Sequence, residues 1–382
     1  MQMLMTAAAP SSIGNESPSS DRLASQTIET KGSVHSKAVE KVAILVQKDE
    51  YAILRPYLKQ YAADIADAFS FKIKIFKGSW STPFDARSKL QKIYQSFNVS
   101  GCILVGNIPI AYYMAEYDLP QGHIVHAFPT DLYYMDLDGT WIDDNEDGIF
   151  EERIDPDTIE IWVSRIKTPI DDLNLIIDFF EKNHEYREGM LEVPHRVMMF
   201  QENDGEEWGP RRVEVLKVLY DPSNIVAVYH ENETTKANYI NTLNLGHEFL
   251  FVNSHGSPWM QYLKEPIGSK YFTYTDAKNI EKGCIFYLLF CCEVGKYDVN
   301  DYLAGWYVFG NSYGLAALAS TTVWESIDPI LFINKLNNSY VGEAFFEIIK
   351  YADLAAETDP IVARNLYYGA TLIGDPILQL GD

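Results

Sequence analysis

Short apolar runs that alternate with amphipathic segments constrain the fold of this 382-residue chain more than any other feature of its sequence. The first block alternates strand-like runs with segments of helical spacing, in the order 42–46, 53–69, 71–76, 84–97 and 101–105. A strand–helix–strand–helix–strand order of this kind predicts a parallel sheet with helices packed on its faces.

A second block of the same kind begins after an irregular acidic stretch, residues 108–157. We expect a helix at 169–186 and strands at 159–163, 197–201, 225–229, 248–253, 284–290 and 315–319. The sequence therefore predicts an α/β fold whose mainly parallel sheet continues through two halves, with a boundary near Lys167. We expect a disordered segment at 1–40, a first subdomain at 41–167 and a second at 168–382.

The charge of the chain limits its partners. Acidic residues outnumber basic ones by 54 to 31, which gives a net charge of -23. Phosphate backbones and anionic membrane surfaces would repel such a chain, so we expect neither nucleic acid nor a membrane as a partner.

No uncharged apolar stretch approaches the ~18 residues of a transmembrane helix, and residues 1–10 lack the features of a signal peptide. Two of the four cysteines are adjacent, and we expect no disulfide framework.

Two strand ends carry residues suited to nucleophilic catalysis. The run 249–252 leads into Asn253-Ser254-His255-Gly256, and the run 285–290 leads into Cys291-Cys292. A thiol nucleophile needs a base within about 3 Å and backbone N–H donors for the oxyanion. His255 can supply the base, and the amides of Gly256 and Cys292 can supply the donors. Taken singly, a turn histidine and a packing cysteine are the simpler interpretations, but their positions at two strand ends favour catalysis.

Further motifs accompany this pair. They are Cys292 followed by Gly295, Asp131-Leu132-Tyr133-Tyr134 leading into Asp138-Gly139 and Asp147-Gly148, Val163-Ser164-Arg165-Ile166, Ala319-Ser320-Thr321 and Gly374-Asp375-Pro376-Ile377-Leu378. In order and spacing, over roughly residues 42–380, the chain resembles the gingipain-type peptidases among the caspase-like cysteine peptidases.

The resemblance implies a caspase-like three-layer α/β sandwich and a protein or peptide substrate. It implies Cys292 as the nucleophile, His255 as general base and acid, and Glu202 as the residue that orients the histidine. Around the P1 pocket it places Glu206, Glu207 and Trp324 as substrate-binding residues. It also suggests a secreted protein.

The acidic stretch is a candidate calcium site. Asp143-Asp144-Asn145-Glu146-Asp147-Gly148 fits the pattern D-x-N-x-D-G, which offers oxygen ligands at alternate positions and a glycine at the turn. The twelfth position is Ile154 rather than a glutamate, so Glu151, Glu152 or upstream aspartates would complete the shell. A solvated acidic loop is the alternative from the residues alone, and the resemblance favours calcium. The predicted ligands are Asp136, Asp138, Asp143, Asn145 and Asp147.

Two other motifs are set aside. Gly310-Asn311-Ser312-Tyr313-Gly314 matches a G-x-S-x-G elbow, but a helix-like stretch precedes it and a strand follows, the reverse of the required order. His123 and His126 are interpreted as loop residues rather than as a metal pair. We therefore expect a calcium-stabilised cysteine endopeptidase. The alternatives are a calcium-stabilised binding module without turnover, and a self-processing peptidase or transpeptidase.

Overall fold

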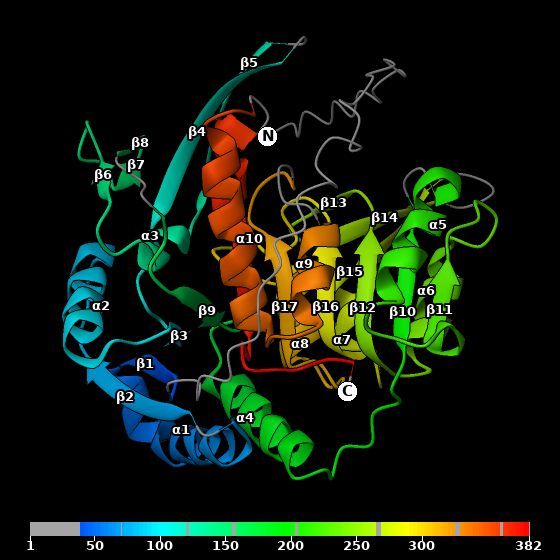
Figure 1. The fold of residues 1–382 in the computed structure, drawn as a ribbon, viewed down its shortest axis with the longest axis horizontal. Helices are drawn as coiled ribbons and strands as arrows, with labels where there is room; N and C mark the ends of the chain where they lie inside the picture. Colours follow the sequence, from blue (N-terminus) through cyan, green and yellow to red (C-terminus); the bar gives the residue numbers. More distant parts are fainter. Residues whose placement is uncertain are drawn as a thin grey trace, which may run out of the picture. The chain divides into compact units, whose positions relative to one another are not determined.

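A ten-stranded sheet forms the centre of the computed structural model (Figure 1). From one edge to the other, its strands are β11 (Ile225–Val228), β10 (Val197–Gln201), β12 (His247–Asn253), β16 (Cys284–Phe290), β17 (Ala316–Ser320), β18 (Ala370–Gly374), β9 (Trp162–Ile166), β3 (Gly101–Val105), β1 (Lys41–Gln47) and β2 (Lys72–Gly78). All neighbouring strands run parallel except β17 and β18.

The structure describes residues 39–69, 71–119, 122–154, 158–202, 205–264, 269–324, 329–359 and 362–381. The predicted disordered segment at 1–40 lies outside these ranges apart from residues 39 and 40. Within these ranges, no helix is both long enough and apolar enough to span a membrane.

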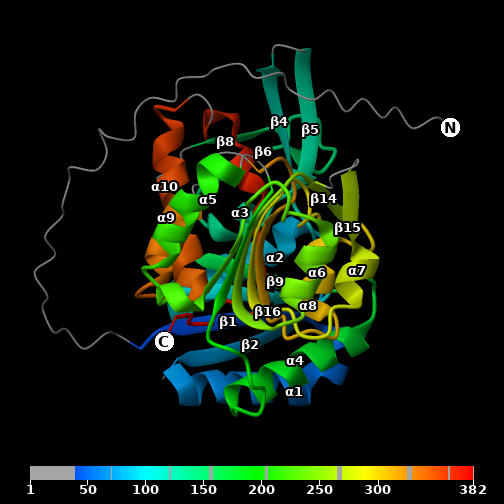
Figure 2. The ribbon, with the colours of Figure 1, turned by 90° about the vertical axis from the view of Figure 1, so that its right-hand side faces the viewer.

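Helices cover both faces of the sheet. They are α1 (Lys48–Phe69), α2 (Pro83–Phe97), α3 (Leu132–Met135), α4 (Leu173–Arg187), α5 (Gly205–Leu216), α6 (Lys236–Leu243), α7 (Tyr274–Lys278), α8 (Leu303–Phe309), α9 (Pro329–Leu336) and α10 (Val341–Ala356). Seen along the sheet, α5, α9 and α10 lie on one side and α6, α7 and α8 on the other (Figure 2). The predicted α/β sandwich with a mainly parallel sheet is confirmed.

The strands form where the sequence is apolar on both sides of the chain. In β1, β3, β16 and β17 the interior residues are buried throughout, which is the pattern of a strand covered on both faces. Helix α2 begins where Thr82 and Asp85 form a capping box, and it ends at Asn98 in the left-handed conformation. Local signals of this kind explain why the predicted and observed elements agree closely here.

In the central sheet, one predicted strand is displaced, and one observed strand was not predicted. Strand β9 begins at Trp162 rather than at residue 159, because the N–H groups of Glu160 and Ile161 both point at the carbonyl oxygen of Met135 instead of joining the sheet. The unpredicted strand is β18, which lies between β17 and β9 and so joins the two halves of the sheet. The boundary near Lys167 follows β9 directly, and the division into subdomains stays a prediction.

The stretch 108–157, expected to be irregular, contains a hairpin and several short strands. The hairpin consists of β4 (Tyr112–Leu119) and β5 (Gly122–Pro129), and β4 also pairs with β7 (Ile149–Phe150). The other short strands of this stretch are β6 (Thr140–Ile142) and β8 (Glu152–Ile154). A separate small sheet outside it consists of β13 (Gly256–Ser257), β14 (Met260–Lys264) and β15 (Ser269–Thr273). The hairpin strands lack the uninterrupted apolar runs that identify the central strands. Much of this two-stranded ribbon faces solvent, so polar and acidic residues interrupt its sequence.

Two of the motifs noted in the sequence meet in the core. Arg165, fully buried on β9, pairs with Asp131 at 2.5 Å and donates a second hydrogen bond to the carbonyl oxygen of Ile108 at 3.0 Å. The pair ties the start of α3 to the sheet. Both charges are desolvated, so removing either partner would leave the other buried and unpaired.

Candidate active site

The carboxyl ends of three neighbouring strands bring the predicted catalytic residues to one edge of the sheet. The register places Gln201 of β10 beside Asn253 of β12, and Asn253 beside Phe290 of β16. Glu202, His255 and Cys292 each follow one of these strand ends within two residues. The structure therefore gathers the three residues at the edge where parallel sheets carry their sites.

Gly256 lets the segment of His255 pack directly on the segment of Cys291 and Cys292. A Cβ atom added to Gly256 would lie 2.8 Å from the carbonyl oxygen of Cys292 and 3.1 Å from the Cβ atom of Cys291. Any side chain at this position would force the two segments apart. The carbonyl oxygen of His255 accepts a hydrogen bond from the N–H of Tyr262 at 2.9 Å, which fixes the other side of the segment. The imidazole itself belongs to an exposed residue.

Cys292 differs from the other three thiols in its exposure. It is partly exposed, whereas Cys102, Cys284 and Cys291 are buried. Burial raises the pKa of the Cys291 thiol to about 11, and it raises the pKa values of Cys102 and Cys284 further. Because the thiolate is the reactive form, these three thiols are chemically quiet. Cys291 also packs against Gln261, whose amide donates to its sulfur at 3.2 Å.

The loop that follows Cys292 is held by its backbone. Glu293 has a φ of 58°, which is uncommon for a residue with a side chain. Its N–H donates to the carbonyl oxygen of Thr322 at 2.8 Å, and the N–H of Gly295 donates to the carbonyl oxygen of Ser320 at 2.8 Å. The end of β17 and the residues after it thus set the path of the chain that follows Cys292.

Glu202 lies beside the end of β12. Its side chain is buried, and its N–H donates to the carbonyl oxygen of Asn253 at 2.9 Å. His255 follows Asn253, the last residue of β12, by two residues. Glu202 follows the end of β10, the strand next to β12. Glu202 thus lies on the side of β12 that faces away from β16 and Cys292.

The predicted substrate-binding residues do not lie together. Trp324 is buried, and its ring centroid lies 5.2 Å from that of Phe290, the last residue of β16. Glu206 and Glu207 are exposed on α5, and Glu206 pairs with His230, beyond the edge strand β11, at 2.9 Å. Trp324 is thus beside β16, the strand that precedes Cys292, whereas Glu206 is directed towards the edge of the sheet.

Sequence reasoning missed Arg212, a cation behind the strand ends. Arg212 is buried on α5, and its guanidinium lies 5.0 Å from the ring centroid of Phe251 and 5.7 Å from that of Phe290. A cation on an aromatic face is electrostatically favourable. The local signal in the sequence is the tandem Arg211-Arg212 after Trp208, whose ring both arginines contact. The rings of Phe251 and Phe290 lie on strands that are distant along the sequence.

The five predicted calcium ligands fall into two separate clusters. Asp143 and Asp147 lie with Glu151, with ligand atoms within 4.8 Å of one another, and the amide of Asn145 contacts Glu151 at 3.3 Å. Asp136 and Asp138 lie in another cluster with Glu160.

Asp136 has a different setting from the exposed loop acids. It is fully buried, and its carboxylate accepts hydrogen bonds from Gly139 at 2.6 Å, from Trp141 at 3.0 Å and from Arg153 at 2.6 Å. Arg153 also pairs with Asp353 at 2.8 Å. The structure therefore makes Asp136 part of a buried ionic cluster, with its charge already balanced by a guanidinium.

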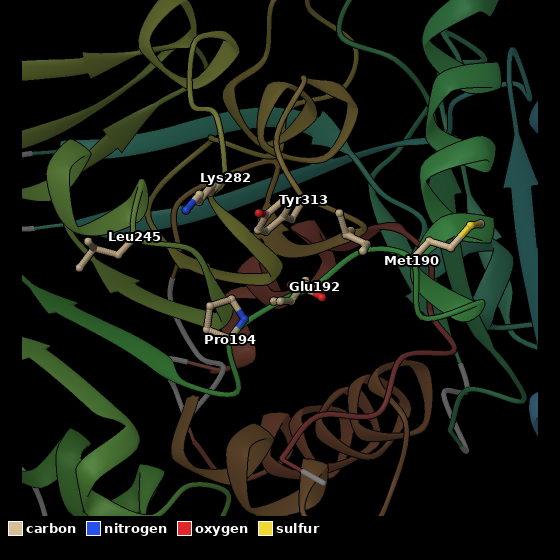
Figure 3. Close-up of a pocket in the computed structure, with 8 residues that line it drawn as sticks. Met190, Glu192, Pro194, Leu245, Lys282 and Tyr313 are labelled. Atoms are coloured by element: carbon tan, nitrogen blue, oxygen red, sulfur yellow. The ribbon is translucent and has the colours of Figure 1, made fainter.

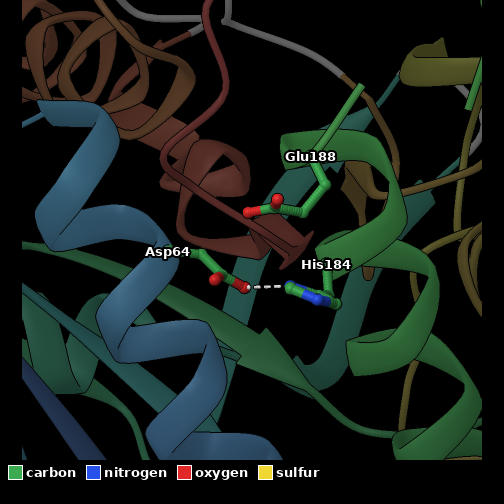
Figure 4. Close-up of side chains that lie close together, drawn as sticks. All are labelled: Asp64, His184 and Glu188. Atoms are coloured by element: carbon green, nitrogen blue, oxygen red, sulfur yellow. Dashed lines mark hydrogen bonds and ion pairs between the residues drawn. The ribbon is translucent and has the colours of Figure 1, made fainter. Parts of the chain in front are cut away.

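A third group of possible ligands was not predicted. Asp64 on α1 lies with His184 and Glu188, which end α4, and these ligand atoms are again within 4.8 Å of one another (Figure 4). Asp64 accepts hydrogen bonds from His184 at 2.9 Å and from Gln60 at 2.8 Å. We interpret the group as an ion pair that ties α1 to α4; no sequence motif joins residues so far apart.

A surface hollow of about 950 Å³ lies at the opposite end of the strands (Figure 3). Leu245 and Lys282, which line it, precede β12 and β16, whereas His255 and Cys292 follow them. The hollow therefore lies away from His255 and Cys292.

Comparison with known proteins places the chain in a family. None of the curated proteins searched matches it. The sequence model of peptidase family C25 matches residues 59–381, nearly the whole chain, and the matched region contains Glu202, His255 and Cys292. The chain therefore belongs to peptidase family C25, the gingipain family of cysteine peptidases.

Proposed function

We propose that the chain is a cysteine endopeptidase that uses Cys292 and His255 as its catalytic pair. The approach of Gly256 to the backbone of Cys292 carries the proposal, because it places the residue after the histidine against the nucleophile segment. The exposure of Cys292, in contrast to its buried neighbour Cys291, supports the same assignment.

The proposed reaction follows the chemistry of an activated thiol. His255 takes the proton of the Cys292 thiol, and the sulfur attacks the carbonyl carbon of the scissile peptide. The N–H groups of Gly256 and Cys292 stabilise the oxyanion. The C–N bond then breaks, the amine leaves with the proton from His255, and a thioester remains. Water, deprotonated by His255, hydrolyses the thioester and releases the acid. Glu202 orients the imidazole.

For the P1 side chain, the geometry favours Trp324 over the two glutamates of α5. Trp324 packs on Phe290, which is two residues from Cys292. Glu206 already pairs with His230, and Glu207 shares its exposed helix turn. We therefore propose Trp324 as a wall of the P1 pocket, with the glutamates as outer contacts.

A thiol-reactive peptide probe tests the catalytic pair. We expect the probe to modify Cys292 alone of the four cysteines, as mapped by mass spectrometry, and His255→Ala to slow the modification about 10²-fold. His195→Ala is the matched control, because His195 lies outside the proposed site: it precedes β10 and pairs with Glu248 at 3.1 Å. Equal rates in the His255 and His195 variants, or no labelling of Cys292 in the wild type, would contradict the proposal and favour a binding module.

We propose calcium for the cluster of Asp143, Asp147 and Glu151, with Asn145 as a further oxygen donor. Calcium takes six to eight oxygen ligands at about 2.3–2.6 Å, so ligands around one ion lie up to about 5 Å apart. The ligand atoms of the three carboxylates lie within 4.8 Å of one another. Unlike Asp136, these residues have no basic partner among the ion pairs of the described ranges.

Calcium should stabilise the folded chain through this cluster. A ligand at a hundredfold excess over its Kd adds about 2.7 kcal/mol to the free energy of unfolding. We expect calcium to raise the Tm in the wild type and Asp143→Asn to remove most of that rise. Asp144→Asn is the control, since Asp144 is an exposed acid of the same loop outside the cluster. A wild-type Tm that does not change with calcium, or an equal calcium-induced rise in Tm in the two variants, would contradict the site.

A further inference from the structure

The β4–β5 hairpin precedes the predicted boundary near Lys167, yet it contacts the loop that follows the nucleophile. Figure 1 shows the hairpin extending beyond the edge at which β10, β12 and β16 end. Two of its residues reach the loop: Tyr112 at the start of β4 and His126 on β5. The tyrosine hydroxyl donates to Asp298 at 3.3 Å. The hairpin therefore meets the chain on the C-terminal side of Cys292.

His126 faces the residue next to the nucleophile. Its Nε2 atom lies 4.0 Å from Oε1 of Glu293. This nitrogen is buried, and no hydrogen-bond partner is within reach of it in the described part of the chain. Lys296, whose Nζ lies 3.6 Å from the same carboxylate oxygen, is the other charged group that faces the histidine. A small rotation of Glu293 would bring its carboxylate to hydrogen-bond distance of the imidazole.

Glu293 is a sensitive point for the geometry of Cys292. Its left-handed backbone conformation costs about 1–2 kcal/mol for a residue other than glycine. Contacts must hold this conformation, and its N–H bond to Thr322 is one of them. Because the N–H of Glu293 and the carbonyl group of Cys292 share one peptide plane, a change in the backbone of Glu293 would turn that plane directly beside Cys292.

We propose that His126 is a positioning residue for Cys292, acting through a hydrogen bond from its Nε2–H to the carboxylate of Glu293. The inference rests on the proposed role of Cys292 as the nucleophile. Burial lowers the pKa of His126, so the imidazole donates in its neutral form over most of the pH range in which proteins work. The hairpin thereby completes the active site from the first half of the chain.

The test compares His126→Phe with His126→Gln. Phenylalanine keeps a ring beside Phe128, whose centroid lies 5.7 Å from that of His126, but removes the donor. Glutamine keeps a donor at nearly the same reach. We expect His126→Phe to lower kcat for peptide hydrolysis about tenfold to a hundredfold with little change in KM, and His126→Gln to retain most of the rate. The rate of alkylation of Cys292 should change in the same order.

His123→Phe is the matched control, because His123 lies on the same strand and pairs with Asp118, at the exposed end of the hairpin. Glu293→Gln supplies a double-mutant cycle with His126→Phe, and we expect the double variant to lose no more than the worse single variant. The inference is overturned if His126→Phe has the wild-type kcat and alkylation rate, if His123→Phe loses as much, if the losses add, or if the loss merely follows a fall in Tm.

Alkylation separates this inference from the proposed function. A wild-type protein that cleaves no peptide would contradict the function. The alkylation rates of Cys292 in the two His126 variants would then still report whether His126 positions the thiol. Wild-type cleavage with identical alkylation in all variants would reject the positioning role alone.

Discussion

Replacement of Cys292 by alanine should lower peptide hydrolysis by about 10⁶-fold, the loss expected when the nucleophile of a covalent mechanism is removed. No other thiol can take over, because Cys102, Cys284 and Cys291 are buried and have raised pKa values. The measurement is the initial rate of cleavage of a mixed peptide library, followed by mass spectrometry. The fold should persist, since Cys292 is partly exposed and its side chain is small.

Cys291→Ala provides the control within the same dipeptide. This change removes a buried sulfur that contacts Ser254 at 3.4 Å and Gln261 at 3.2 Å, so a loss of about 1 kcal/mol in the free energy of unfolding is expected. The cleavage rate should stay close to that of the wild type. A Cys292→Ala protein that still cleaves, beside an inactive but folded Cys291→Ala protein, would exchange the roles of the two cysteines.

The edge of the sheet that carries the candidate catalytic residues could be predicted because its signals are local. A strand buried on both faces is an uninterrupted apolar run, so β12 and β16 are visible in the sequence, and their ends identify His255 and Cys292. Glu202 follows the same logic at the end of β10. The resemblance to the gingipain-type peptidases added the predicted roles of these residues; the family match confirms the resemblance, and the roles stay predictions.

The features that escaped prediction depend on distant parts of the chain. Strand β18 has an ordinary apolar sequence, but its place between β17 and β9 comes from pairing across the whole chain. Asp136 belongs to the same acidic stretch as Asp143, and only the fold reveals that Arg153 and Asp353 bury it in an ionic cluster. From the sequence, His126 is interpreted as one of two loop histidines, and only the folded hairpin brings it close to Glu293. Spacing along the chain carries no information about such contacts.

The residue that follows β18 joins the C-terminal segment to α4 and to α1, a helix that precedes the predicted boundary near Lys167. Asp375 is fully buried. Tyr61 of α1 donates to it at 2.7 Å, Asn183 of α4 donates at 2.7 Å, and Arg187 pairs with it through Nη2. The N–H of Ile377 donates at 2.9 Å. The carboxylate thus satisfies four donors from three segments, and its charge balances the buried guanidinium of Arg187, whose pKa is raised despite desolvation by burial, because Asp375 stabilises the charged form.

Asp375→Asn should therefore lower the free energy of unfolding by about 3–5 kcal/mol, because it leaves Arg187 buried without a counter-charge. Equilibrium unfolding in urea, read by far-ultraviolet circular dichroism, measures the change. Glu347→Gln is the surface control: its pair with Lys335 at 3.0 Å is exposed, and such pairs contribute about 0–1 kcal/mol. A loss for Asp375→Asn no larger than that of Glu347→Gln would contradict the role of Asp375 as the joint between the halves.

The double variant Asp375→Asn with Arg187→Met separates the lost charge balance from the lost hydrogen bonds. Methionine fills much of the arginine volume without a charge, and replacement of both members of a buried pair is often far less costly than removal of one. We expect the double variant to recover part of the stability lost in Asp375→Asn, and the rest of the loss to measure the bonds from Tyr61, Asn183 and Ile377. If the two losses simply add, the unpaired charge of Arg187 is not the cause, and the destabilisation comes from the hydrogen bonds that hold the segment after β18.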